Sequence, residues 1–421
     1  MLASHVDCGG GVDYHHFRAL FKVEAMYLTL ACFAALLFVY SLVSEKVERL
    51  SLSGPIVFVA VGAALGPLGL EWFNPSVNFG NGKLLIDLTL ALFLFVDAAS
   101  ADLTVLKKNW RIPGRMLLLG LPVTMFLGAL LALMLFPAFS IYEAAILGVM
   151  LAATDAALGK AVVTNQGVPA HLREGLSAES GLNDGLAVPF LLLFIALEQG
   201  AAVRGEGVAL ELLAEEVGIG LAVGVVLALI AATVVRLARD LDWLGHVWQR
   251  MSVPALAILI FAVAQGLHGS GYIAAFVGGL CFRAAMKEDV HTMLLPAEGV
   301  GEVLAMVAWV LFAMMLLPAA LPHVGWSELI YAVLSLTVIR MVPIILSLTG
   351  SGESMASKAF LAWFGPRGLA SLAFATIVWS EQIPEAGTLV AVTILTVGIS
   401  LAVHGVTARP FASRLAERAN T

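Results

Sequence analysis

The chain has 421 residues, of which 60% are hydrophobic and 13% are charged, and its mean hydropathy is +0.95. Because soluble proteins carry roughly a quarter of charged residues, this composition excludes a water-soluble fold. The formal net charge of −7 gives no reason to expect a nucleic-acid partner. The three cysteines, Cys8, Cys32 and Cys281, are odd in number and widely spaced, which predicts neither a disulfide framework nor a metal site.

The chain order predicts a short lead, a long apolar domain and a short tail. Residues 1–24 contain no apolar run, so we expect an N-terminal lead there and no secretory signal peptide. Residues 25–408 are expected to form the transmembrane domain of an all-α polytopic membrane protein, and 409–421 a cytoplasmic tail. An apolar run of about 17–25 residues is long enough to cross a bilayer as a helix. Thirteen such runs are predicted, at 25–43, 53–70, 84–100, 115–137, 142–164, 174–198, 209–237, 252–268, 270–286, 299–318, 325–349, 357–379 and 386–408.

The basic residues support this count, because Lys and Arg accumulate in cytoplasmic loops. With the N-terminus outside and the C-terminus in the cytoplasm, seventeen of the 23 Lys and Arg residues fall inside and four outside. The remaining two, Arg340 and Arg367, lie within predicted helices. A miscounted helix would invert every later loop and remove this asymmetry.

Thirteen helices divide into six over 25–198, a linking helix over 209–237 and six over 252–408. An odd linker inverts the second half relative to the first, which is a common plan in transporters. The fifth helix of each half carries a polar interruption, Thr154-Asp155 in one and Gly365-Pro366-Arg367-Gly368 in the other. Paired interruptions of this kind point to a binding site at the membrane midplane.

Several charged residues lie within the predicted membrane helices. Inserting one charged side chain into the middle of a membrane helix costs about 3 kcal/mol on insertion scales. In the sixth predicted helix, Glu179 and Asn183 share one face, as do Ser180 and Asp184, because each pair is four residues apart. Asp184 precedes an apolar run, where burial disfavours the charged form of a carboxyl group, so it can exchange a proton for a cation. The alternative for Asp184 is a solvated carboxylate in a loop.

Arg340 lies in the middle of the eleventh predicted helix and requires an anion, because guanidinium does not lose its proton in proteins. Glu179 is the preferred partner, in a structural ion pair, with the other membrane carboxylates as alternatives. If the fifth helix is broken, its freed carbonyls can coordinate Na⁺ and Asp155 can compensate the positive ends of half-helices. Arg367 can neutralise carbonyl ends, the alternative there being a proline kink at Pro366. We expect Asp97 to be interfacial or to line a funnel, and His404, near a predicted helix end, to be solvated.

The combination of Ala153-Thr154-Asp155, Glu179 to Gly185, Arg340 and Gly365 to Ser371 resembles the monovalent cation:proton antiporter family of the NhaP and eukaryotic NHE type. The resemblance covers all thirteen predicted helices. It implies a fold of the NhaA/NapA type, with two inverted six-helix repeats and two crossed, unwound helices. It also implies a cation- and proton-binding site in which Asp184, Ser180 and Thr154 bind the transported Na⁺. Glu179 is the fourth cation- and proton-binding residue that it implies, and it is also paired with Arg340. The supporting residues that it implies are Asn183, Asp155, Arg340 and Arg367.

The resemblance predicts a secondary antiporter and not an enzyme. We expect exchange of Na⁺, with Li⁺ or K⁺ as alternatives, for protons, without cofactors, by elevator-type alternating access. The neutral Asn183 beside Asp184 is typical of the electroneutral branch. A homodimer in a bacterial inner membrane is expected, and the extent of unwinding is open because Ala156 stands where the family commonly has proline. The alternatives are a K⁺/H⁺ antiporter of the same fold and a cation channel.

Overall fold

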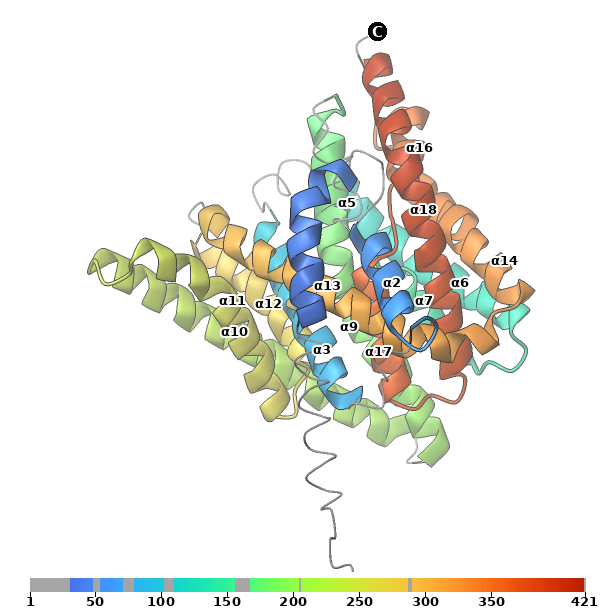
Figure 1. Ribbon diagram of the computed structural model, residues 1–421, viewed down its shortest axis with the longest axis horizontal. Coiled ribbons are helices and arrows are strands. Elements are labelled where there is room, and N and C mark those ends of the chain that lie inside the picture. Colours follow the sequence, from blue (N-terminus) through green and yellow to red (C-terminus); the bar gives the residue numbers. More distant parts are fainter. Residues whose placement is uncertain are drawn as a thin grey trace, which may run out of the picture.

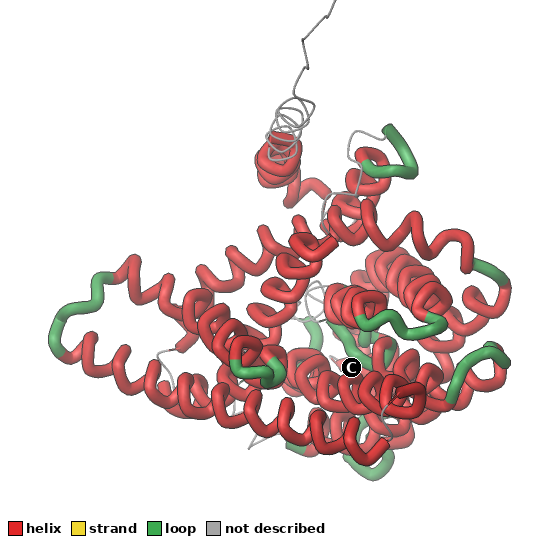
Figure 2. The backbone as a smooth tube through the Cα atoms, turned by 90° about the horizontal axis from the view of Figure 1, so that it is seen from below, coloured by secondary structure: helices red, strands yellow, loops and turns green. Residues whose placement is uncertain are grey.

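The computed structural model describes residues 31–47, 54–70, 79–101, 110–155, 167–203, 206–286 and 290–419. All regular secondary structure in these ranges is helical, as Figure 2 shows, so the predicted all-α class is confirmed for them. The expected N-terminal lead, and Ala156 with the rest of 156–166, lie outside the described residues.

The first set of helices, here called the scaffold group, packs mainly against itself. In it α12 lies against α3, α10 and α11, while α13 covers α2 and α3. Figure 1 shows α10 and α11 side by side along one flank of the molecule. The group consists of a helix over 31–47, α2 (Gly54–Leu65), α3 (Phe79–Ser100), α10 (Glu206–Asp240), α11 (His246–Gly266), α12 (Gly271–Met286) and α13 (Val290–Ala320), which continues into the short helix η3 (Leu321–His323).

The second set, the core group, forms the other side of the molecule, where α14 packs against α18 and α6 at the outer edge (Figure 1). It contains two long helices that each include a π-helical turn, α5–η1–α6 and α14–η4–α15. Its members are α5 (Arg111–Arg115), η1 (Met116–Gly120), α6 (Leu121–Leu135), α7 (Ile141–Met150), α9 (Ala170–Val203), α14 (Trp326–Leu334), η4 (Ser335–Ile339), α15 (Arg340–Ser347), α16 (Met355–Trp363), α17 (Leu369–Ser380) and α18 (Ala386–Ala419).

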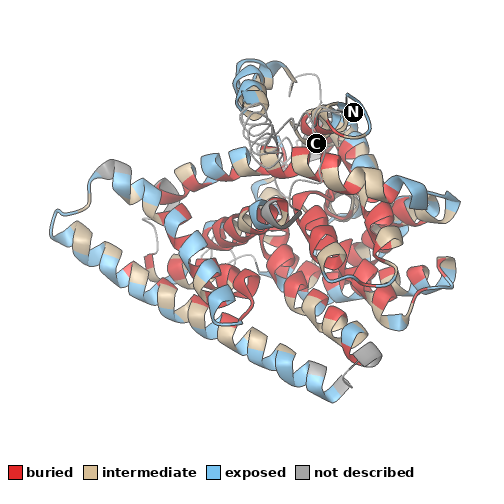
Figure 3. Cartoon of the chain, turned by 60° about the horizontal axis from the view of Figure 1, so that its bottom comes forward, coloured by how far each residue is buried: buried red, intermediate tan, exposed pale blue. Residues whose placement is uncertain are grey.

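The centre of the molecule is buried and its outer helices are exposed, as Figure 3 shows, and many of the exposed side chains are large and hydrophobic. On α10, for example, Val226, Ile230 and Val234 are all more than half exposed. A soluble monomer does not expose such a continuous stripe, whereas a lipid-facing helix does. By length and composition, seven helices of the described chain can cross a membrane. The protein is therefore a multi-pass membrane protein.

Each of the thirteen expected ranges overlaps helical residues, but the count of thirteen crossing helices and the inverted repeat remain predictions. The two helices expected on either side of Gly269 and Ser270 are present as α11 and α12. The last helix does not end near residue 408, because α18 continues through the expected tail to Ala419.

Two of the expected helices are interrupted. The helix α7 ends at Met150 and residues 151–155 are not helical. The helix α16 ends at Trp363, and α17 begins only at Leu369 after five non-helical residues. The alternative of a simple proline kink at Pro366 is therefore wrong, because a kinked helix would continue through this segment.

Candidate ion-binding site

The two interruptions meet at the centre of the core group. The backbone N–H of Asp155 donates a hydrogen bond of 2.8 Å to the carbonyl of Pro366. The side chain of Asp155 accepts a hydrogen bond of 3.0 Å from the N–H of Leu369, the first residue of α17. A carboxylate at the start of a helix satisfies a free N–H and compensates the positive end of the helix dipole.

Arg367 compensates the opposite end of the other broken helix. Its Nη1 atom donates hydrogen bonds of 3.0 Å to the carbonyls of Ala152 and Ala153, just beyond the end of α7. These carbonyls carry the negative partial charge of the helix end, so a buried guanidinium is favourable there. The structure thus places Asp155 and Arg367 at the broken ends that the sequence predicted for them.

Two glycines allow this close crossing. A Cβ atom on Gly365 would lie 2.5 Å from Nε of Arg340, and a Cβ atom on Gly368 would overlap the carboxylate of Asp155. Any larger residue would therefore push one of these side chains away from the backbone. The Gly-Pro-Arg-Gly sequence combines this space with a proline, which has no N–H to continue the helix.

The predicted partner of Arg340 is confirmed as Glu179. The Nη1 and Nη2 atoms of Arg340 donate hydrogen bonds of 2.8 and 3.1 Å to the two carboxylate oxygens of Glu179, and both side chains are 1% exposed. This two-bond geometry suits the planar guanidinium. The pair joins α9 to α15, two helices that are more than a hundred residues apart in the chain.

Asn183 and Ser180 attach α9 to the unwound segment. The side-chain amide of Asn183 donates a hydrogen bond of 2.5 Å to Oγ1 of Thr154 and accepts one of 3.3 Å from the Thr154 backbone N–H. The hydroxyl of Ser180 donates a hydrogen bond of 2.8 Å to the carbonyl of Thr154. The hydroxyl oxygens of Thr154 and Ser180 and the carbonyl oxygen of Thr154 therefore converge beside α9.

Asp184 lies beside this group of oxygens. It is 8% exposed, and within the described chain its Oδ1 atom is buried without a hydrogen-bond partner. The negative charges of Asp97, Asp155 and Glu179 act on its carboxylate. Because a buried oxygen without a partner is costly, a bound proton or a bound cation would stabilise this carboxylate.

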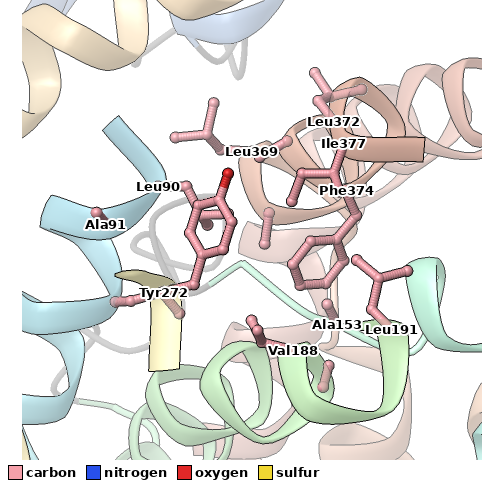
Figure 4. Close-up of a cluster of buried hydrophobic side chains, with 14 of the residues drawn as sticks. Leu90, Ala91, Ala153, Val188, Leu191, Tyr272, Leu369, Leu372, Phe374 and Ile377 are labelled. Carbon is pink, nitrogen blue, oxygen red and sulfur yellow. The ribbon is translucent and has the colours of Figure 1, made fainter. Parts of the chain in front are cut away.

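An apolar contact of buried side chains lies beside this region. Leu90 of α3 and Tyr272 of α12 face Val188 of α9 and Leu369 of α17, with further buried side chains around them (Figure 4). This contact lies between the scaffold group and the core group. Fixed charges nearby are poorly screened in such surroundings, which strengthens the electrostatic interactions of the site.

Two acidic residues of α3, Asp97 and Asp87, were not among the predicted site residues. Asp97, expected at an interface or funnel, is half-buried, and its Cβ atom would lie 3.5 Å from a Cβ atom on Gly181 of α9. Asp87 accepts a hydrogen bond of 2.7 Å from the hydroxyl of Tyr272, with both side chains buried. The signal for Asp87 was present, since a carboxyl group within an apolar span requires a partner.

His404 was expected to be solvated, and this expectation is wrong. The side chain is 4% exposed and makes hydrogen bonds through both ring nitrogens. The error followed from placing the end of the last helix near residue 408, whereas α18 continues for several more turns. Among the described residues, no group of three His, Cys, Asp or Glu side chains could hold a metal ion.

Broken helices that cross in a bilayer, with charged side chains at their ends and a buried carboxylate beside them, define the class of ion-coupled membrane transporters. Residues 33–414 match the family described as sodium/hydrogen exchanger, transmembrane. The chain belongs to this family.

Characterised relatives include both sodium and potassium antiporters. The Na(+)/H(+) antiporter 2 of Zygosaccharomyces rouxii is 28% identical over 387 residues, which cover 86% of this chain and 47% of the relative. The K(+)/H(+) antiporter NhaP of Alkalimonas amylolytica is 25% identical over 400 residues, which cover 93% and 67%. The chain thus spans about half the length of the Zygosaccharomyces rouxii relative, and the same holds for a probable Na(+)/H(+) antiporter of Schizosaccharomyces pombe.

The fold is that of a solved antiporter. The structure of the sodium proton antiporter MjNhaP1 from Methanocaldococcus jannaschii at pH 8 superimposes with a TM-score of 0.77 at 20% identity. The match covers 93% of this chain and 99% of that structure. The likeness therefore extends over both the scaffold group and the core group.

Proposed function

We propose that this chain exchanges Na⁺ for H⁺ across the membrane and that Asp184 binds the two ions in turn. The observation that carries this proposal is the buried Oδ1 atom of Asp184, which has no hydrogen-bond partner in the described chain. The neighbouring Ser180 and Thr154 side chains do have partners. A proton on Asp184 neutralises the carboxyl group, and a cation pairs with it, so each ion removes the same energetic penalty.

The other site residues have distinct proposed roles. Asp184, Ser180 and the main-chain carbonyl of Thr154 supply hard oxygen ligands, which suit monovalent metal cations. Asn183 holds the unwound segment against α9, so the carbonyl keeps its position when the ion leaves. Glu179 contributes negative charge to the site, but its direct partner is Arg340, and the pair acts mainly as a structural link.

One exchangeable carboxylate implies electroneutral exchange. Asn183 has no charge, so a single Na⁺ or a single H⁺ occupies the site in each half of the cycle, and no net charge crosses the membrane. The division into a scaffold group and a core group supports an elevator movement, in which the core group carries the site across the apolar contact. We also propose a homodimer in a bacterial inner membrane, with the N-terminus outside and the C-terminus in the cytoplasm.

K⁺ is the second candidate ion. Relatives named as K(+)/H(+) antiporters cover most of this chain, and oxygen ligands accept Na⁺, Li⁺ and K⁺ alike. A cation channel is the alternative mechanism. It predicts cation flux that is independent of an opposing proton flux, so measuring the coupling separates the two.

The test uses purified protein in liposomes that contain a pH-sensitive dye, with Na⁺, Li⁺ and K⁺ offered in turn. Asp184→Asn should fold and insert but lose cation-driven proton movement, because an amide neither binds a proton in this range nor neutralises a cation. The matched control is Glu174→Gln, which changes an exposed carboxylate on the same helix and should transport like the parent. Coupled transport by Asp184→Asn would contradict the assignment of the site.

A further inference from the structure

The side chain of His404 connects α18 to the end of α16 beside the broken helix. Its Nε2 atom lies 2.9 Å from the carbonyl of Trp363, the last residue of α16. Its Nδ1 atom lies 2.9 Å from the carbonyl of Ser400 and 3.2 Å from the Ser400 hydroxyl. That hydroxyl accepts a hydrogen bond of 2.8 Å from the backbone N–H of Arg367. His404 is therefore one hydrogen bond away from the residue that compensates the end of α7.

The hydrogen bonds that the imidazole makes differ between its two protonation states. In the neutral form, Nε2–H donates to the Trp363 carbonyl and Nδ1 accepts from the Ser400 hydroxyl. In the protonated form, Nδ1–H donates to the Ser400 carbonyl, so the Ser400 hydroxyl loses its acceptor and must rotate. Proton binding thus changes the hydrogen bonding of the group that holds the backbone of Arg367.

Proton binding to His404 also adds a positive charge to a region that already holds two guanidinium groups. The charges that act on His404 are those of Arg367 and Arg340, and both are positive. Trp363, Phe364 and Phe411 form a wall of aromatic rings beside the imidazole and its neighbours. The ionisable side chains described on the other elements packed against α18 are Lys358 on α16, Glu328 on α14, Glu143 on α7, Glu298 and Glu302 on α13, and His323 on η3, whose ring lies beside Gly387 of α18.

We propose that His404 is a second proton-binding group, which positions the broken segment between α16 and α17 and slows exchange when it is protonated. The inference rests on the proposed function. A third positive charge beside Arg367 and Arg340 opposes the arrival of a cation at Asp184. The rearranged Ser400 hydroxyl at the same time loosens the segment that crosses α7.

A purely structural role for His404 can be separated from this one. Trp363 also donates a hydrogen bond of 3.0 Å from its indole N–H to Thr407 of α18. Thr407→Val therefore removes another link between α16 and α18 without removing a titratable group, and is the matched control. His404→Gln is the main variant, because its amide donates and accepts like neutral imidazole but does not bind a proton. His404→Asn is the second variant, in case glutamine does not fit.

The experiment measures the rate of exchange in liposomes at saturating Na⁺ from about pH 4 to 8. The range extends below that of a free histidine, because burial and the positive charges of Arg367 and Arg340 oppose proton binding to His404. The parent and Thr407→Val should slow several-fold as the pH falls. His404→Gln should vary by less than about twofold over this range, because it keeps the hydrogen bonds of the neutral form. An unchanged pH profile in His404→Gln, or a flattened one in Thr407→Val, would overturn the proposal.

Two further outcomes are decisive. If both His404 variants fail to fold while Thr407→Val folds, His404 is only a structural anchor and the proposal is wrong. If the parent shows no proton flux with any cation, the proposed exchange itself fails, and this result is visible before any variant is compared.

Discussion

Removing one partner of the Glu179–Arg340 pair should destabilise the protein more than any change at the ion site. Glu179→Ala leaves the Arg340 guanidinium without its carboxylate, and its Nε atom already has no partner in the described chain. Arg340→Ala leaves Glu179 with weaker neighbours, Asn183 at 3.3 Å and Thr154 at 3.5 Å. We therefore expect Glu179→Ala to be the more damaging of the two.

The expected magnitude follows from the burial of both side chains, each 1% exposed. Removing one partner of a fully buried pair costs about 3–5 kcal/mol, because the remaining charge stays in a medium of low dielectric constant. Replacing both partners by uncharged residues of similar volume removes this penalty. The double variant Glu179→Gln/Arg340→Met should therefore be more stable than either alanine variant.

The assay is thermal unfolding of the purified variants in one detergent or lipid nanodisc, together with the yield of correctly inserted protein. Glu174→Gln serves again as the control, since its carboxylate is exposed on the same helix. Alanine variants as stable as the parent would refute the pairing argument. A double variant no more stable than Glu179→Ala would show that lost packing, and not a stranded charge, causes the instability.

Three more outcomes are expected. Gly365→Ala should lose about 1–3 kcal/mol of stability through overpacking against Arg340. Gly299→Ala is the control and should be neutral, because nothing lies within 4 Å of a Cβ atom there. Equal melting temperatures for the two variants would contradict this prediction. The apparent KM for Na⁺ should rise as the pH falls, because H⁺ competes for Asp184; a KM independent of pH in flux assays would exclude competition at one carboxylate. The exchange rate should not respond to a membrane potential clamped with K⁺ and valinomycin, and a several-fold response would require a second transported charge.

The chemistry of several site residues could be predicted from the sequence because it follows from burial alone. An arginine in the middle of an apolar helix requires an anion, and a carboxyl group there requires a proton or a cation. Likewise, Gly365 and Pro366 within one apolar run predict an interruption of the helix. Such arguments need only the position of a residue within a span, which hydropathy supplies with an error of a few residues.

Contacts between distant helices could not be predicted in the same way. His404 and Asp97 each lie near the end of a predicted span, where a solvated position is the ordinary expectation. The packing of α18 against α16 buries His404, and the approach of α9 to α3 brings Asp97 beside Gly181. These contacts depend on how helices pack, which the periodicity of a single helix does not contain.

The sequence by itself determined that the chain spans a membrane, and it located the interruptions in two of the helices. It also determined that Asp184 and Arg340 need partners, because desolvation acts on each residue separately. Only the tertiary structure decided that Arg340 pairs with Glu179 and not with Asp97, Asp155 or Asp184. It also decided that the end of α7 meets Arg367. These choices depend on the distances between helices that are far apart in the chain, and the Coulomb energy of a buried pair changes steeply with that distance.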